Sequence, residues 1–366
     1  MYLINRKRLI RTFSELVRIS SPSWKEALVR EYIIRSVKKL PVICKKYPCG
    51  SSHNLLLTMD GERKRKPILF SAHMDTVTPC EKVKPVVTDK KIASDGTTIL
   101  GSDDKAAIAM FLESLTVIAE TGMPHGPIEM LFSCAEEVGL CGIKCFNMPL
   151  LKSRHAFVFD SDGHIGKIVL KAPYHSTMKI SVIGKAAHAG MEPEKGINAI
   201  KVLSEIIMRL PSGRIDHETT LNVGTIAGGR ATNIVAEEAY CVLEVRSIDR
   251  KKLMLNEALV RETARETAAR FSARCTITRS LEYSGFSISQ DDPVVRAAVG
   301  AMRRIGITHQ FEISGGGSDT NIFNKAGIRA VNLSAGMQSV HTGREYILIR
   351  DLVDGARLVL SIIDLI

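Results

Sequence analysis

Apolar and polar positions along the first part of the chain form short apolar runs that alternate with longer amphipathic stretches. Residues 5–40 have helical spacing, and a second helix is expected over 104–120. Strands are expected at 54–59, 67–73, 127–134 and 155–159. Strands buried on both faces read as continuous apolar runs, and their alternation with helices predicts an α/β domain with a mainly parallel sheet flanked by helices.

The middle of the chain has a different pattern, in which strands alternate as in hairpins. Strands are expected at 178–184, 220–229, 238–248 and 274–283, with helices at 196–210 and 250–271. This pattern indicates an α+β domain inserted into the first. The helical pattern resumes at 292–306, and the apolar run 329–334 completes the first sheet. We therefore predict a discontinuous catalytic domain, 1–173 plus 285–366, and an inserted α+β domain, 174–284.

Length and composition agree with two domains in a cytoplasmic protein. The chain has 366 residues and 45% hydrophobic content, which is enough to fill two cores. No apolar stretch approaches the roughly 20 residues of a membrane span, and the N-terminal segment has no signal-peptide core. We therefore expect no membrane partner. The eight cysteines form no CxxC pair, so we expect reduced thiols.

The formal charge of +11 raises the possibility of nucleic-acid binding. The densest basic run, 63–66, lies between two apolar segments like a solvated hairpin turn, and no aromatic residues are interleaved for base stacking. We therefore expect no nucleic-acid partner. A positive field remains suited to attracting anionic peptides or acyl amino acids.

Histidines and acids follow the ends of the predicted strands, where open α/β sheets collect their ligands. These residues are His73 and Asp75, Asp103 and Asp104, Glu136 and Glu137, Asp160, and His341. Oxygen and imidazole ligands of this kind suit zinc, cobalt or manganese, and two such ions roughly 4 Å apart share a bridging carboxylate and a water. The set predicts a two-metal hydrolytic site.

Spacing and chemistry divide the roles among these residues. Asp75 is placed to hold the imidazole of His73 from behind, and Asp103 to bridge the metals. We assign Glu137 as a ligand and Glu136 as the base that later protonates the leaving amine.

Each of these segments also has a structural reading. His73 suits a hydrogen-bonded core residue, either aspartate of 103–104 suits an N-cap, and Asp160 lies in an ordinary turn sequence. The adjacent glutamates suit a solvated loop. The segment 315–319, which contains Gly316, could present backbone N–H groups to a substrate carboxylate or oxyanion, or simply form a turn.

At these residues the chain resembles the peptidase T-like (tripeptide aminopeptidase) branch of the dinuclear zinc metallopeptidase superfamily, which also contains aminoacylase and succinyl-diaminopimelate desuccinylase. The resemblance covers nearly the whole length. The segments that carry it are SAHMDTV, LGSDDKAAIA, SCAEEVGLCG, FVFDSDG, GKAAHAG, TNIVAEEAY, EVRSID, GGGSDTNIF and SVHTGREYI.

The resemblance implies a zinc-exopeptidase-like catalytic domain that holds two zinc ions. One ion would be bound by His73, Asp103 and Asp160, and the other by Asp103, Glu137 and His341. It also implies a cis peptide bond between Asp103 and Asp104, and an inserted domain that acts as a lid and forms a homodimer.

In the inserted domain, His188 matches a histidine that reaches the scissile carbonyl, and Asn233 and Arg246 match substrate-binding positions. Each could instead have a purely structural role. His188 could be a turn residue and Asn233 a turn cap, and Arg246 could form a surface ion pair with Glu244 or Asp249.

The hypothesis that follows is an aminopeptidase that removes the N-terminal residue of tripeptides or other short peptides through a metal-activated water. The nearest alternative is an N-acyl-amino-acid amidohydrolase of the same architecture, which would accept a blocked amine. A catalytically silent binding protein is the alternative from another class, although such proteins usually lose ligands or the base. The chain retains all of these residues.

Overall fold

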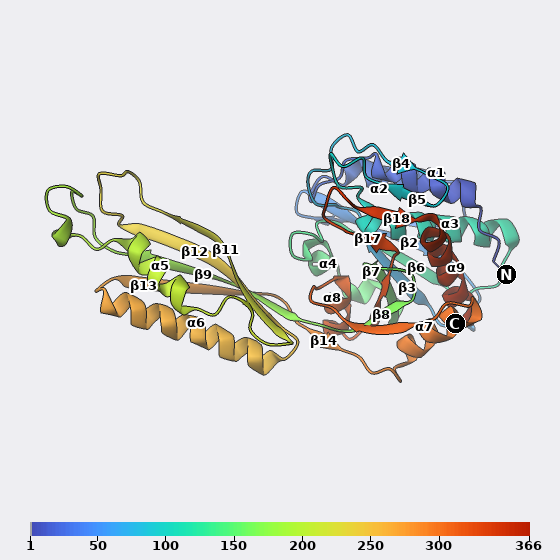
Figure 1. Ribbon diagram of the computed structural model, residues 1–366. Helices are drawn as coiled ribbons and strands as arrows, with labels where there is room; N and C mark the ends of the chain where they lie inside the picture. The colour runs from blue at the N-terminus through green and yellow to red at the C-terminus, as the bar shows by residue number, and fades with distance from the viewer. Residues whose placement is uncertain (1) are drawn as a thin grey trace. The chain divides into compact units, whose positions relative to one another are not determined.

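The structure is a computed structural model that describes residues 2–366. Contacts divide the chain into two compact units (Figure 1). The first unit ends at Lys171 and continues with Ser287–Ser314 and Ser318–Ile366, whereas the second unit is Ala172–Phe286 with Gly315–Gly317. Residues 174–284, predicted as the inserted domain, lie in the second unit, and the lid role inferred for them stays a prediction.

The first unit is built on a nine-stranded sheet in the order β1-β2-β6-β3-β7-β16-β8-β14, with β15 paired to β8. The strand β3 runs parallel to β6 and β7, and β16 runs parallel to β7. The strands are β1 Ile43–Cys49, β2 Ser52–Met59, β3 Ile68–His73, β6 Ile128–Ser133, β7 His155–Ser161, β8 Lys167–Ala172, β14 Phe286–Ser287, β15 Gln310–Ile313 and β16 Arg329–Ser334. The mainly parallel sheet predicted from the sequence is confirmed.

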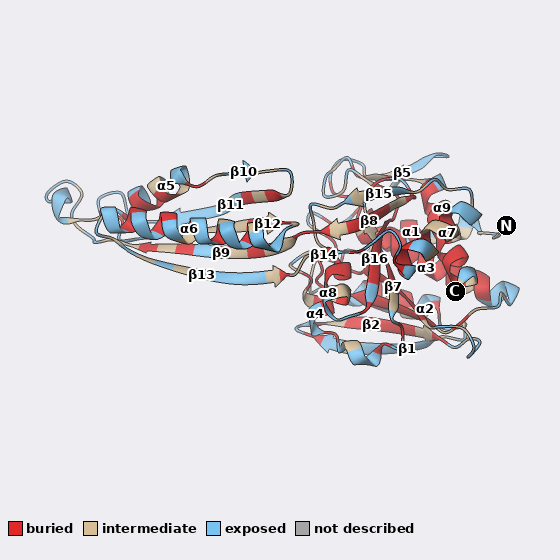
Figure 2. Ribbon diagram, turned by 90° about the horizontal axis from the view of Figure 1, so that it is seen from below, coloured by how far each residue is buried: buried red, intermediate tan, exposed pale blue. Residues whose placement is uncertain are grey.

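Helices flank this sheet and bury its apolar residues. The helices are α1 Arg6–Val17, α2 Ala27–Ser36, α3 Ser102–Thr121, α4 Cys141–Cys145, α7 Pro293–Arg304, α8 Asp319–Lys325 and α9 Ile349–Leu365, with a 3-10 turn at Met148–Leu150. The helix α3 packs on β3 and β7, where the ring of Phe111 lies 5.6 Å from Phe70 and 5.5 Å from Phe159. The helices α1 and α9 pack against α3 in turn, and most residues of α3 are buried. Figure 2 colours the buried residues of this unit red.

Several elements were not predicted from the sequence. They include β1, β8, α9 and a small sheet in the order β17-β18-β5-β4, formed by Met337–Gln338, Tyr346–Leu348, Lys91–Ala93 and Val86–Val87. The expected hairpin turn at 63–66 was wrong, because β6 lies between β2 and β3 in the sheet. The run itself forms an exposed turn, apart from partly buried Arg65.

The second unit has a five-stranded antiparallel sheet in the order β10-β11-β12-β9-β13, together with two helices. Along β9, Met178, Ile180 and Val182 are buried in the core with α5 and α6, while the residues between them are more exposed. The elements are β9 Tyr174–Ile183, β10 Gly213–Arg214, β11 Thr219–Gly228, β12 Glu238–Ser247, β13 Arg274–Tyr283, α5 Ala199–Arg209, α6 Arg250–Arg270 and a 3-10 turn at Pro193–Lys195.

The expectation of eight reduced thiols was wrong for two of them, because Cys49 and Cys145 form a disulfide. The strand β1 and the helix α4 bring their Cα atoms to 5.7 Å although 96 residues separate them in the chain. No local spacing motif marks such a pair, so it depends on tertiary contacts. In the part of the chain that the structure describes, no helix is both long and apolar enough to span a membrane.

Candidate metal centre

Three neighbouring parallel strands deliver acidic and imidazole groups to one edge of the sheet. His73 is the last residue of β3, Asp160 lies near the end of β7, and Glu136 follows the end of β6 by three residues. Because β6, β3 and β7 are adjacent and parallel, their carboxyl ends meet at the same edge. This edge is where the sequence placed the metal site.

Asp103 lies at the centre of the group and contacts both histidines. Its Oδ1 is 2.9 Å from Nε2 of His73, and its Oδ2 is 3.1 Å from Nε2 of His341. Nε2 of His341 is also 3.0 Å from Oε1 of Glu137, and Nε2 of His73 is 3.7 Å from Oδ1 of Asp160. The structure thus brings together the five side chains predicted as ligands, with Asp103 shared between two sets.

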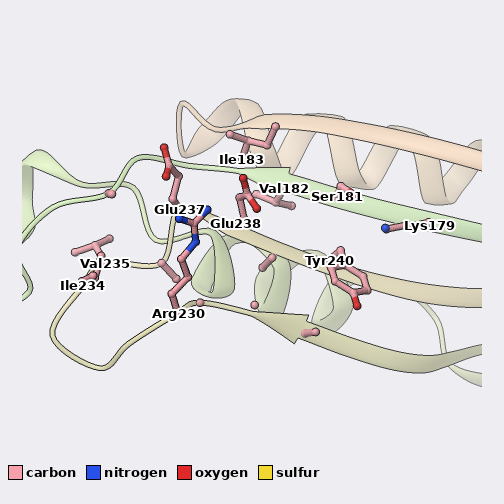
Figure 3. Close-up of a pocket in the computed structure, with 16 residues that line it drawn as sticks. Lys179, Ser181, Val182, Ile183, Arg230, Ile234, Val235, Glu237, Glu238 and Tyr240 are labelled. Carbon is pink, nitrogen blue, oxygen red and sulfur yellow. The ribbon is translucent and has the colours of Figure 1, made fainter.

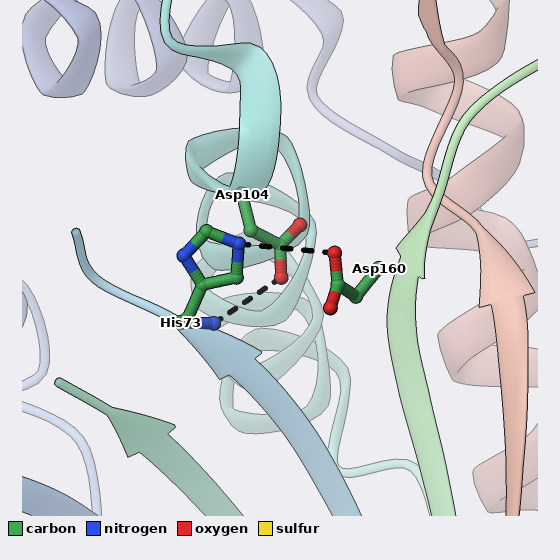
Figure 4. Close-up of side chains that lie close together, drawn as sticks. All are labelled: His73, Asp104 and Asp160. Atoms are coloured by element: carbon green, nitrogen blue, oxygen red, sulfur yellow. Dashed lines mark hydrogen bonds and ion pairs between the residues drawn. The ribbon is translucent and has the colours of Figure 1, made fainter. Parts of the chain in front are cut away.

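Asp104 was included in the predicted set but was assigned no ligand role, and it belongs to the same cluster. Figure 4 shows His73 with Asp104 and Asp160, whose ligand atoms all lie within 4.8 Å of one another. Oδ2 of Asp104 accepts a hydrogen bond from the backbone N–H of His73, while its buried Oδ1 has no hydrogen-bond partner. The peptide bond between Asp103 and Asp104 is cis, as the resemblance implied.

The protonation of these groups reflects crowding of negative charge in a buried place. Burial lowers the pKa of His73, but hydrogen bonds with Asp103, Asp160 and Asp75 outweigh it and raise the pKa well above its usual value. Hydrogen bonds with Asp103 and Glu137 raise the pKa of His341 to about 10. Burial raises the pKa of Asp160 to about 7.

Imidazole and carboxylate donors in this arrangement fit divalent metal ions such as zinc, cobalt or manganese. The buried Oδ1 of Asp104 without a hydrogen-bond partner, and the contacts of Asp103 with two histidines, fit a donor set of this kind. The role of these histidines and carboxylates as metal ligands is a proposal, which is argued below.

Asp75 holds the adjacent loop more directly than it holds the imidazole of His73. Nδ1 of His73 is 2.9 Å from the backbone carbonyl oxygen of Asp75 and 3.6 Å from its carboxylate. That carboxylate instead accepts hydrogen bonds from the backbone N–H groups of Glu136 and Glu137, at 2.9 and 3.2 Å, and from the hydroxyl of Ser23. Asp75 therefore fixes the loop that carries the predicted base and one predicted ligand.

Two further buried carboxylates at this edge were not singled out from the sequence. Glu26 accepts hydrogen bonds from the backbone N–H groups of Trp24 and Ala135 and from the hydroxyl of Ser52. Asp319 accepts one from the hydroxyl of Ser133 at 2.6 Å, and burial raises its pKa to about 6. Glu26 has no local motif that identifies it, because Ser52 and Ala135 come from distant segments. Asp319 lies in the glycine segment 315–319 but was given no role of its own.

The remaining predicted site residues lie in the second unit. His188 and Asn233 are exposed neighbours, since the N–H of Ala189 donates to the carbonyl of Asn233 at 3.0 Å. Arg246 donates two hydrogen bonds of 3.0 Å to the carboxylate of Glu244, which is the surface ion pair that the sequence offered as its structural role. Gly316 is partly buried in the glycine segment. Their roles toward a substrate stay predictions.

A cavity of about 660 Å³ also lies in the second unit, beside the segments that carry His188 and Asn233 (Figure 3). Its lining combines apolar Ile183 and Val235 with the charged Lys179 and Arg230. The ammonium group of Lys179 lies 4.3 Å from the ring centre of Tyr240. The cavity contains none of the predicted metal ligands.

Comparisons with known proteins agree with this architecture. Residues 174–271 match the model of a protein family described as a peptidase dimerisation domain. The YqjE protein of Bacillus subtilis is 38% identical over 99% of both chains. The crystal structure of aminopeptidase PepT from Bacillus cereus is 37% identical, with a TM-score of 0.89 over 99% of both chains. A Staphylococcus aureus tripeptidase is 36% identical, with a TM-score of 0.93 over 99% of this chain and 98% of the other.

The fold, the clustered histidines and carboxylates, and these relatives define a hydrolase of the peptidase class. The chain belongs to the M20 peptidase family, and its relatives place it among the peptidase T-like members. Peptidase T of Escherichia fergusonii is 26% identical over 75% of this chain and 67% of its own length.

Proposed function

We propose that the protein is a two-zinc aminopeptidase that removes the N-terminal residue of tripeptides or other short peptides. The observation that carries this proposal is the position of Asp103, whose two carboxylate oxygens face two different histidines. A carboxylate shared in this way is suited to bridging two ions, with His73 and Asp160 on one side and Glu137 and His341 on the other.

When bound, the ions would polarise the scissile carbonyl and lower the pKa of a water from 15.7 to about 7. Glu136 is the group proposed to take the proton from that water and pass it to the leaving amine. Burial, followed by the charge of Asp160, raises the pKa of its carboxyl well above its usual value. A raised pKa suits a group that must accept a proton and then release it near neutral pH.

The second unit supplies the proposed substrate contacts. His188 would steady the oxyanion, Asn233 and Arg246 would bind polar groups of the peptide, and Gly316 would offer its backbone N–H. The charge of Arg246 is partly engaged by Glu244, so a substrate carboxylate would have to compete with that ion pair.

The substrate proposal is tested with matched free and N-acetylated tripeptides. We expect the zinc-loaded protein to cleave only the free peptides, because an aminopeptidase requires a free N-terminal amine. The metal-free protein is the control, and release of amino acids measured by chromatography is the readout. Turnover of the acetylated set would instead identify an N-acyl-amino-acid amidohydrolase, and no metal-dependent turnover would contradict both.

We also propose that the protein is a homodimer formed through the second unit. The support is the match of residues 174–271 to a peptidase dimerisation domain. Light scattering of the full-length protein should give twice the mass of the chain. A monomer across micromolar concentrations would contradict this proposal.

A further inference from the structure

We propose that Glu345 is a positioning residue that fixes Asp103 and His341 relative to each other and thereby sets the metal affinity of the Asp103–Glu137–His341 position. We call this position the second metal position, and the His73–Asp103–Asp160 position the first. The inference rests on the proposed two-metal function, but it concerns a residue that touches neither a substrate nor a ligand side chain.

Glu345 is 1% exposed. Its carboxylate accepts hydrogen bonds from four consecutive residues that lead into and begin α3. Its Oε2 accepts hydrogen bonds from the N–H groups of Leu100 and Gly101, at 2.7 and 2.9 Å. Its Oε1 accepts from the N–H and hydroxyl of Ser102 and, at 3.4 Å, from the N–H of Asp103. One side chain therefore holds the backbone that leads into the bridging aspartate.

The backbone of Glu345 is tied to the segment that carries His341. Its N–H donates to the carbonyl of Thr342 at 3.2 Å, and the hydroxyl of Thr342 donates to the carbonyl of Ser339 at 2.7 Å. The carbonyl of Glu345 accepts from the N–H of Ser94 at 2.9 Å. His341 thus lies in a compact turn whose end is anchored by the buried carboxylate.

This anchor matters because His341 has little packing of its own. Its side chain is 46% exposed, and the contact of 3.1 Å with Asp103 joins residues 238 positions apart. The first metal position differs, because His73 and Asp160 lie on paired strands of the central sheet. Because Asp103 is shared by both positions and His341 belongs only to the second, loss of Glu345 should weaken the second metal position more than the first.

A purely structural role would affect the protein differently. If Glu345 only capped the start of α3, its loss would lower stability without separating the two metal positions. Outer partners of metal ligands typically contribute 10–100-fold in metal affinity. Separate affinities for the two positions therefore distinguish positioning from capping, whereas activity alone does not.

The test is a cobalt titration of the metal-free, full-length variant Glu345→Gln, followed by visible absorption and calorimetry. Glutamine offers one acceptor oxygen and turns its amide N–H₂ toward backbone N–H donors. We expect two binding steps in the unaltered protein, of which the weaker is assigned to the second metal position. In the variant this step should be a further 10–100-fold weaker, and the tighter step should change by a smaller factor.

The matched control is Glu129→Gln. Glu129 is a buried carboxylate of the same unit that accepts from the N–H groups of Lys152 and Ser153, at 3.0 and 2.8 Å. This variant should lose thermal stability and bind both cobalt ions as the unaltered protein does. Equal weakening in both variants would overturn the inference, and so would two unaltered binding steps in Glu345→Gln.

A second variant covers the case in which Glu345→Gln does not fold, as judged by circular dichroism. Ser102→Ala removes one donor to Glu345 and leaves the carboxylate in place. It should weaken cobalt binding at the second metal position by a smaller factor than Glu345→Gln does. Unchanged affinity at that position would overturn the inference. If the unaltered protein itself bound fewer than two ions, the two-metal proposal would fail, and the role of Glu345 would fail with it.

Discussion

Replacing Glu136 by glutamine should lower kcat for tripeptide hydrolysis by roughly 10² to 10⁴ while leaving metal binding intact. The amide cannot accept the proton of the attacking water, and it keeps nearly the same volume in a site where Glu136 is 8% exposed. The backbone hydrogen bond from Glu136 to Asp75 does not involve the replaced atoms, so the loop should keep its position.

The measurement pairs steady-state kinetics with metal analysis of the same preparation. Glu62→Gln is a suitable control, because this glutamate is exposed and its carboxylate lies 3.3 Å from Nε of Arg65, away from the predicted ligands. Retained activity in Glu136→Gln would exclude the proposed base. Loss of activity together with loss of metal would mean that Glu136 acts as a ligand instead.

Replacing Asp103 by asparagine should abolish activity by removing metal from both positions. Asparagine keeps one acceptor oxygen, but it has no negative charge and cannot bridge two cations through two equivalent oxygens. We expect the metal content to fall below one ion per chain and kcat/KM to fall on the order of 10³ or more, because the activated water is lost.

Metal content is measured by mass spectrometry after dialysis, with Asp162→Asn as the control. Asp162 lies two residues beyond Asp160, is 61% exposed and pairs with Lys167 at 3.7 Å. A variant Asp103→Asn that retains two ions and full activity would contradict the bridging role. Retention of a single ion would indicate that the two positions do not share this residue.

The sequence was most informative where local pattern and buried strands coincide. The apolar runs 155–159 and 329–334 became the adjacent parallel strands β7 and β16, because such runs are stable only when both faces are covered. The start of α3 shows the limit of this reasoning. Asp103 and Asp104 lie in the first turn of α3, yet they have non-helical φ and ψ angles. Asp104 accepts a hydrogen bond from the backbone N–H of His73 at the end of β3.

Tertiary structure also changed the interpretation of individual side chains. Asp75 was assigned to the imidazole of His73, and its carboxylate also accepts hydrogen bonds from the N–H groups of Glu136 and Glu137, which the sequence did not predict. The basic run at 63–66 looked like the turn of a hairpin, but β6 separates the strands on either side. The wrong hairpin and the missed loop contacts of Asp75 arise because residue spacing specifies direction within one segment and not the neighbour that it meets.

The sequence by itself determined many of the elements, the α/β class and the residue types available for metal chemistry, because hydrophobic periodicity and ligand chemistry are local properties. Only the tertiary structure decided which acids converge on the two histidines, that Cys49 meets Cys145, and that Glu345 holds the start of α3. These contacts join segments separated by about a hundred residues or more in most cases, and they exist only once the sheet and its helices have packed.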